Sequence, residues 1–288
     1  YYVLLYDWRK SNFEAVNDLH DLIDKIRSDY RNPALKVDII AHSNGGLISR
    51  YYLQYGPQAP DQRANPKPWL EGSARIRRIA MLGTPNLGSI ISVSRLYQGF
   101  RFGLRVIPPQ ILSSFATPFE ALPSPKSAVF IDNNGTTVDL DIYDPQLWQR
   151  NEWSVFSPEI RKQVRDNSSN PDADLAKLDS RFISNLQQAK YFQQALSVPL
   201  PKNSTEIALF GGDCKLTDSR AVVENDAGKL KLAFEDDQIK DKKKNVDYAQ
   251  WLLAPGDGLV TRESQLAQAA NVYLNAKLSS DLFPIKQT

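Results

Sequence analysis

Residues 41–46, with the sequence A-H-S-N-G-G, place a serine in the setting of a nucleophile. The apolar run at 37–40 is typical of a buried strand, and residues 47–54 have the pattern of a helix. A serine on a tight strand-to-helix turn is strained and exposed, and small neighbours let the turn close. The usual pattern is G-x-S-x-G, with Ala41 replacing the first glycine here. We predict that Ser43 is an acyl-transfer nucleophile; the alternative is an ordinary turn that contains a serine.

A serine hydroxyl needs a base within hydrogen-bond reach and an acid that holds the base. In hydrolases with this turn, the order along the chain is Ser, then Asp or Glu, then His. Two aspartates follow apolar segments in glycine-rich loops, Asp257 in G-D-G and Asp213 in G-G-D. Either could present a carboxylate at the edge where the strands end, and position alone does not separate them.

The histidines do not complete the pattern. The chain has two, His20 and His42, and both precede Ser43. His42 adjoins the serine on the incoming strand, so its side chain is expected to point away from the hydroxyl. His20 lies among apolar neighbours in a predicted helix, which is typical of a packed histidine. Either the base lies outside these residues, or the protein is a hydrolase-fold module that binds a lipid or a partner without catalysis.

The other groups of a candidate site follow from the chemistry of ester attack. The oxyanion needs backbone N–H donors, and Asn44, directly after the nucleophile at a helix N-terminus, is the expected first donor. The second donor is expected upstream of Tyr1. Asp7 and Trp8 are candidate pocket residues because they follow a predicted strand near the same edge of the sheet. The alternative, which we favour for Asp7 and Arg9, is a pair that pins the loop.

The elements that must position these groups alternate between strand and helix. Strands are expected at 1–6, 37–41, 76–82 and 206–210, with helices at 13–30 and 47–55, which indicates a parallel sheet flanked by helices. A hairpin is expected at 221–234, and a last strand at 271–274. From 92 to 203 prolines interrupt the rhythm before a long amphipathic helix at 172–196. We interpret 1–91 and 204–288 as the two parts of one core and 92–203 as a cap insertion; the alternative is a second structural domain.

Composition narrows the class of protein. The chain has 288 residues, 42% hydrophobic and 24% charged, as expected for a globular α/β protein. Its net charge of +2 does not predict a nucleic-acid or anionic partner. Cys214 is the single cysteine, which excludes an internal disulfide and favours a reducing compartment such as the cytoplasm; the alternative is an exported protein without disulfides. The sequence lacks an apolar run of about 18 residues. Because it begins inside a strand-like run without methionine, we expect an internal fragment.

Four motifs occur in order: Y-D-W-R at 6–9, A-H-S-N-G-G at 41–46, G-T-P-N-L-G-S at 83–89 and G-D-G-L-V at 256–260. Together they resemble the lecithin:cholesterol acyltransferase family. The segment F-A-T-P-F-E-A-L-P at 115–123, with Y-D-P at 143–145 and Trp148, is similar to the cap of its bacterial branch. The resemblance covers nearly the whole chain.

This resemblance implies an α/β-hydrolase fold with a large cap insertion, a nucleophile at Ser43 and an acid at Asp257 rather than Asp213. It also implies a histidine base beyond Thr288, which would leave the chain as given inactive. The implied substrate is a lipid ester, and the implied acceptor is water or an alcohol. The resemblance also implies a transient contact of the protein with a membrane surface, and neither a metal nor a cofactor. A non-lipid esterase is the further alternative. Members of the family often have glycine at position 41 and a bulky residue at 44, so Ala41 and Asn44 depart from the pattern. Secreted eukaryotic members also have disulfides, which a chain with one cysteine cannot form internally.

Overall fold

The computed structural model describes residues 1–58, 67–125, 127–200, 204–267 and 277–279. The chain divides into two compact units. The first unit contains residues 1–87, 191–217 and 255–288, and the second contains 88–190 and 218–254. Each unit has a hydrophobic core of its own.

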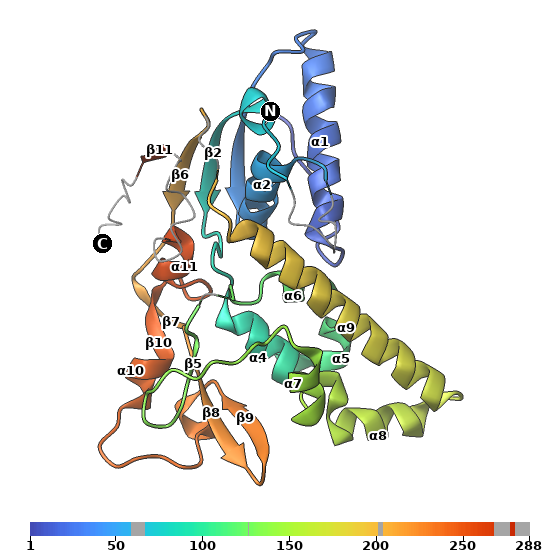
Figure 1. The fold of residues 1–288 in the computed structure, drawn as a ribbon, viewed down its shortest axis with the longest axis vertical. Coiled ribbons are helices and arrows are strands. Elements are labelled where there is room, and N and C mark those ends of the chain that lie inside the picture. Colours follow the sequence, from blue (N-terminus) through green and yellow to red (C-terminus); the bar gives the residue numbers. More distant parts are fainter. Residues whose placement is uncertain (59–66, 126, 201–203, 268–276, 280–288) are drawn as a thin grey trace. The chain divides into compact units, whose positions relative to one another are not determined.

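A parallel sheet with strand order β1-β2-β6-β11 forms the centre of the first unit (Figure 1). Its strands are β1 (Val37–His42), β2 (Ile76–Leu82), β6 (Glu206–Phe210) and β11 (Lys277–Ser279). The register aligns the ends of three strands, because His42 lies beside Leu82 and Leu82 beside Phe210. The residues that follow, including Ser43 and Gly83, therefore leave the sheet at one edge.

Two helices pack together beside this sheet, α1 (Asn12–Asp29) and α2 (Asn44–Tyr55) (Figure 1). The Ser11 hydroxyl accepts a hydrogen bond from the N–H of Phe13 and caps α1. The buried side of α1 has helical spacing, and Phe13 makes an edge-on contact with Tyr51 of α2. Residues on the other face of β1, such as Ile40, are exposed in the described part of the chain. Two short helices complete the described part of this unit, α3 (Gly72–Arg75) and α11 (Arg262–Leu266). The predicted parallel sheet and both predicted helices are confirmed.

The strand predicted at 1–6 is wrong. Residues 1–7 have no regular secondary structure. Leu4 and Tyr6 pack against the core, whereas Tyr1 and Leu5 are exposed. Within the described residues no strand pairs with this segment, and a strand without a neighbour leaves its backbone N–H and C=O groups unpaired. The strand predicted at 271–274 lies outside the described residues.

The second unit is a mixture of short helices and strands. Its first helices are α4 (Ile90–Gln98), α5 (Pro109–Leu112), α6 (Thr117–Glu120), α7 (Pro145–Arg150), η1 (Ser154–Phe156) and α8 (Pro158–Asn167). A hairpin is formed by β3 (Phe100–Phe102) and β4 (Arg105–Ile107), and a second sheet by β5 (Phe130–Ile131), β8 (Ala221–Asp226) and β9 (Lys229–Ala233). Aromatic side chains fill the core, where Trp148 packs edge-on against Trp153 and Phe182.

The remaining elements either extend across the boundary between the two units or lie within the second unit. Helix α9 (Pro171–Leu196) belongs to the second unit as far as Lys190 and confirms the long helix predicted at 172–196. The remaining elements are β7 (Lys215–Asp218), η2 (Asp236–Gln238), α10 (Tyr248–Leu252) and β10 (Leu253–Gly256), with β7 beside β10. The predicted hairpin at 221–234 is confirmed, and positive φ angles at Ala227 and Gly228 form its two-residue turn. The limits 92–203 and the role of a cap stay predictions.

Candidate active site

Ser43 lies on the turn between β1 and α2. Its φ of 51° and ψ of −122° fall in a region that residues other than glycine rarely adopt. The N–H of Ser43 donates to the carbonyl of Leu82 at 2.8 Å, so the strained residue remains tied to β2. This is the geometry of a strand-to-helix turn that presents a serine hydroxyl above a sheet.

The turn at Ser43 requires a glycine at position 46, and it has room for the side chain of Ala41. A Cβ atom at Gly46 would lie 2.0 Å from the Thr84 hydroxyl oxygen, so the loop after β2 leaves no room for a side chain. A Cβ atom at Gly45 would lie 3.8 Å from the Ala41 Cβ, which is an ordinary contact. The methyl group of Ala41 therefore fits where the usual pattern has glycine.

The side chain of Asn44 forms a reciprocal amide pair with Asn12. Asn12 Nδ2 donates to Asn44 Oδ1 at 3.0 Å, and Asn44 Nδ2 donates to Asn12 Oδ1 at 2.7 Å and to the Tyr6 hydroxyl at 3.2 Å. Asn44 is the first residue of α2, so its backbone N–H has no acceptor within the helix, as an oxyanion donor requires. The buried Asn12 thus holds the residue that carries this N–H. Sequence analysis missed Asn12; the signal was a polar residue at 44, which needs a polar partner.

Asp257 is fixed by the backbone of its own loop. Its Oδ1 atom accepts hydrogen bonds from the N–H groups of Leu259 at 2.9 Å and Val260 at 2.8 Å. Its Oδ2 atom lies 3.1 Å from the position that a Cβ on Gly83 would occupy, directly after β2. Neighbouring strands lie about 4.8 Å apart. Asp257 and Ser43 are therefore brought to the same edge of the sheet, at adjacent strands.

Asp213 has a different environment. Its side chain is exposed, and its Oδ2 atom lies 3.5 Å from an Arg262 guanidinium nitrogen. Its Oδ1 atom lies 3.7 Å from the Cys214 sulfur, and Cys214 is exposed as well. The structure places Asp257, not Asp213, against the end of β2.

A buried hydrogen-bond network connects α2 with the loop of Asp257. Arg50 donates to both the carbonyl and the side-chain oxygen of Asn86, and Asn86 Nδ2 donates to the carbonyl of Gln265 at 2.7 Å. Gln265 Nε2 donates to the carbonyls of Val260 at 2.8 Å and Gly212 at 3.2 Å. Gln265 thereby fixes the loop that carries Asp257. The sequence gives no local signal for it, because its partners come from distant segments.

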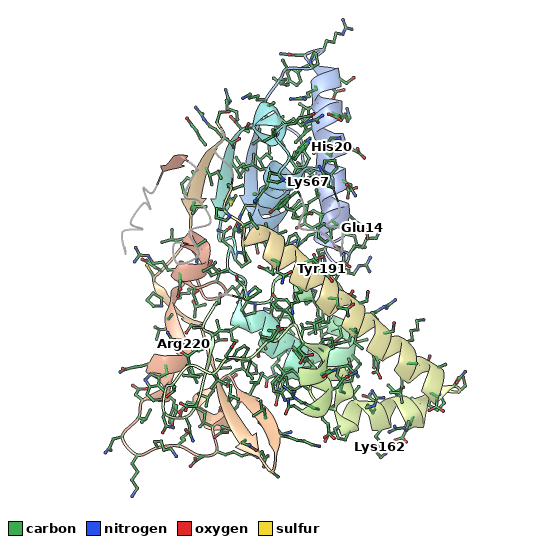
Figure 2. The ribbon with its side chains drawn as sticks, in the orientation of Figure 1. Glu14, His20, Lys67, Lys162, Tyr191 and Arg220 are labelled. Carbon is green, nitrogen blue, oxygen red and sulfur yellow. The ribbon has the colours of Figure 1, made fainter. Side chains whose placement is uncertain are left out.

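The two histidines do not join Ser43 and Asp257. His20 lies on α1, as Figure 2 shows, with Nδ1 3.1 Å from the Tyr52 hydroxyl and Nε2 3.3 Å from an Asp24 carboxylate oxygen. The Nδ1 contact thus joins α1 to Tyr52 of α2, and the Nε2 contact lies within α1. His42 is exposed on β1.

Asp7 and Arg9 form the pair that sequence analysis favoured. Two Arg9 nitrogens lie 2.8 Å from the two Asp7 carboxylate oxygens, and this hydrogen bonding lowers the pKa of Asp7 to about 2. Asp7 also lines an open cavity with Lys10, Glu14 and other residues of the N-terminal segment and α1. Trp8 is exposed and is not among the lining residues. A lining with this much charge does not suit an acyl chain.

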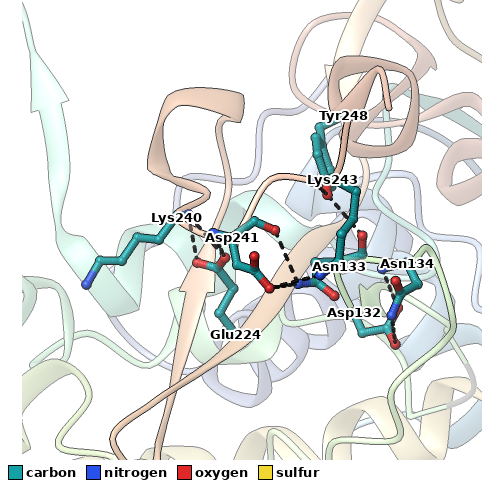
Figure 3. Close-up of polar contacts among 8 residues, drawn as sticks. All are labelled: Asp132, Asn133, Asn134, Glu224, Lys240, Asp241, Lys243 and Tyr248. Atoms are coloured by element: carbon teal, nitrogen blue, oxygen red, sulfur yellow. Dashed lines mark hydrogen bonds and ion pairs between the residues drawn. The ribbon is translucent and has the colours of Figure 1, made fainter. Parts of the chain in front are cut away.

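The second unit contains a separate polar cluster around Glu224 and Asp241 (Figure 3). The Glu224 carboxylate accepts hydrogen bonds from the backbone N–H groups of Lys240 and Asp241. Asp241 accepts from the side chains of Asn133 and Lys243. These contacts fasten the charged loop at 236–244 to β8 and to the turn at 132–136. Within the described residues no group of His, Cys, Asp and Glu side chains could hold a metal ion.

Comparison with known structures identifies the fold. The chain matches a chain in the crystal structure of the Tle4-Tli4 complex with a TM-score of 0.57 and 14% sequence identity, over 94% of this chain and 60% of the other. A homoserine O-acetyltransferase from Bacillus anthracis has 12% identity over 68% of this chain and 50% of its own, with a TM-score of only 0.21. No curated protein sequence matches the chain. The first match and the parallel sheet define an α/β-hydrolase fold.

A sequence model of the lecithin:cholesterol acyltransferase family matches residues 3–204. This chain belongs to that family. The chain spans about 60% of the length of the Tle4-Tli4 chain that it matches. None of the helices in the described residues is long and apolar enough to cross a membrane.

Proposed function

We propose that this protein is a serine-dependent acyl-ester hydrolase or O-acyltransferase that acts on lipid esters. The family membership supports the class of reaction. The observation that carries the residue assignment is the shared sheet edge, where the strained Ser43 follows β1 and the Asp257 carboxylate faces Gly83 after β2.

In the first half-reaction, Ser43 Oγ attacks the ester carbonyl carbon and its proton passes to a base. The carbonyl oxygen takes the electron pair and is stabilised by the N–H of Asn44. When the carbonyl re-forms, the alcohol leaves with the proton from the base, and the acyl group remains on Ser43. In the second half-reaction, water or an acceptor alcohol attacks this acyl-enzyme, gives its proton to the base, and Ser43 is regenerated.

The base in this proposal is an imidazole that Asp257 orients through Oδ2, the carboxylate oxygen that faces the end of β2. His20 and His42 do not fill this role, since one packs in α1 and the other lies on β1 before the serine. We propose that this imidazole belongs to a histidine that follows Asp257 in the chain, in the order Ser, Asp, His. The tests therefore use the complete gene product.

A fluorophosphonate probe tests the nucleophile. The complete gene product should be labelled covalently, and Ser43→Ala should abolish labelling, whereas the exposed Ser28→Ala on α1 should leave it intact. Persistent labelling of Ser43→Ala would mean that another serine reacts. Saturable lipid binding with neither labelling nor turnover would favour a binding module without catalysis.

Ester substrates of increasing acyl length, with and without an added acceptor alcohol, test the substrate class and the second half-reaction. We expect turnover to rise with acyl length. A preference for short, soluble esters would indicate a non-lipid esterase. The ratio of transferred to hydrolysed product assigns acyl transfer or hydrolysis.

A further inference from the structure

The second unit exposes its large hydrophobic side chains in one short stretch. Among its described residues these side chains are Leu104, Val106 and Ile111, and Leu104 is fully exposed at 102%. The other large apolar side chains described in this unit are buried or half-buried. Single exposed hydrophobic residues are common, but a concentration of them marks a contact surface.

The geometry of the β3–β4 hairpin holds Leu104 in place. Phe102 pairs with Arg105, so Gly103 and Leu104 form a two-residue turn, and Gly103 has a φ of 60°. Turns of this length that begin with glycine match the twist of the two strands. At the other end of the hairpin, Phe100 and Ile107 pack against the core of the second unit. The hairpin tip, residues 101–106, therefore projects from a fixed base.

The charge along the sequence on both sides of this tip has one sign. Arg101 and Arg105 are both exposed, and residues 72–119 contain no aspartate or glutamate. A third arginine, Arg95, stacks over the Phe100 ring at 4.3 Å. The net charge of +2 for the whole chain conceals this local excess of positive charge.

We propose that the hairpin tip is a contact site for a lipid surface with anionic headgroups. Leu104 and Val106 would enter the boundary between headgroups and acyl chains, while Arg101 and Arg105 reach the phosphates with their charged ends. The tip is too small for a stable protein interface, which buries about 800 Å² on each partner. One apolar tip with two arginines suits reversible binding to a membrane surface. The inference goes beyond the proposed function and is tested by binding, without turnover.

Sedimentation with vesicles tests the proposal. Wild-type protein should bind phosphatidylcholine vesicles that contain about one third phosphatidylserine, more weakly at about 1 M salt, where charges are screened beyond about 3 Å. The double variant Arg101→Gln/Arg105→Gln should lower partitioning by about 25-fold, at about fivefold per arginine. Leu104→Ser should lower it by about tenfold, on anionic and on neutral vesicles alike.

Matched controls test whether the loss of any exposed arginine or leucine, and not only those of the hairpin, lowers vesicle binding. Arg150→Gln/Arg165→Gln removes two other exposed arginines of the second unit, and Leu70→Ser removes an exposed leucine of the first. Both controls should bind vesicles like the wild type. Equal losses in controls and hairpin variants, or absence of vesicle binding by the wild type, would overturn the proposal. So would a wild-type dimer that the hairpin variants convert to a monomer, because the tip would then be a self-association surface.

An environment-sensitive label measures insertion directly. Cys214 is the single cysteine, so Leu104→Cys in a Cys214→Ser background allows labelling at one position. The fluorescence of the label should rise and shift to the blue when anionic vesicles are added, whereas a label introduced by Leu70→Cys should not respond. An unchanged signal at position 104 would show that the tip stays in water.

Discussion

Asp257 and Asp213 have similar sequence surroundings and different structural ones. Each follows an apolar segment and stands beside glycine. Asp257 has one carboxylate oxygen held by two backbone N–H groups and the other directed at the end of β2. Asp213 is exposed, and its carboxylate lies near Arg262 and the exposed Cys214. A candidate acid is therefore distinguished from a surface charge by two features: the hydrogen bonds that hold the carboxylate and the direction in which it faces.

The hydrogen bonds that hold the loop of Asp257 also differ from those around Asp213. The loop of Asp257 is fastened by Gln265, which is buried and belongs to a network that reaches α2 through Asn86. Gln265 also donates to the carbonyl of Gly212, the residue before Asp213, whereas the Asp213 side chain itself is paired with the exposed Arg262. Removing a group on the Asp257 side should therefore change turnover, and removing one on the Asp213 side should not.

The largest effect is expected for the two aspartates themselves. Asp257→Asn should lower kcat by about 10³- to 10⁴-fold, because the amide cannot hold an imidazole in the required tautomer and charge state. Asp213→Asn should change kcat by less than about twofold. Ester turnover by the complete gene product measures both. The reverse pattern would assign the acid to Asp213.

Gln265→Met tests the loop that carries Asp257. Methionine keeps most of the volume but removes the hydrogen bonds to the Val260 and Gly212 carbonyls, so Asp257 should lose its fixed position. We expect kcat to fall by about ten- to a hundredfold at unchanged KM, since small displacements of catalytic groups have effects of this size. The free energy of unfolding should fall by about 1–3 kcal/mol. A loss of stability with normal kcat would show that Gln265 is only structural.

Arg262→Gln removes the partner of Asp213. The pair is exposed on both sides and its atoms are 3.5 Å apart, so we expect a change in unfolding free energy below about 0.5 kcal/mol and unchanged turnover. Urea denaturation and ester turnover measure the two quantities. A marked fall in kcat would show that this side of the loop also supports the site.

A third aspartate, Asp7, gives the smallest and most local effect. Its pKa of about 2 lies below the ordinary value of 3.8 because of the hydrogen bonds from Arg9. The folded-state pKa is lowered, so the stabilising contribution is complete above about pH 4 and is lost as the pH falls through about 2. NMR titration should find the low pKa in the wild type and a return toward 3.8 in Arg9→Gln. An unchanged titration would show that Arg9 does not hold this carboxylate.

The sequence was informative where the pattern was local. The turn at Ser43 is defined by adjacent residues and a following helix, and the register of β1, β2 and β6 then brings their ends to one edge. The contact between Asp257 and Gly83 joins distant segments, so residue position alone left Asp213 as an equal candidate. Gln265 could not be found for the same reason, and for Asn12 the sequence offered only the polar residue at position 44, which needs a polar partner. The strand predicted at 1–6 failed because a run of apolar residues does not supply a neighbouring strand to pair with.

A crystal structure of the complete gene product with a phosphonate bound to its nucleophile tests the central claim most directly. The account predicts one imidazole between Ser43 and Asp257, with Nε2 within about 3 Å of Ser43 Oγ and Nδ1 within about 3 Å of Asp257 Oδ2. A phosphonate on another serine, or an imidazole held by Asp213, would contradict it.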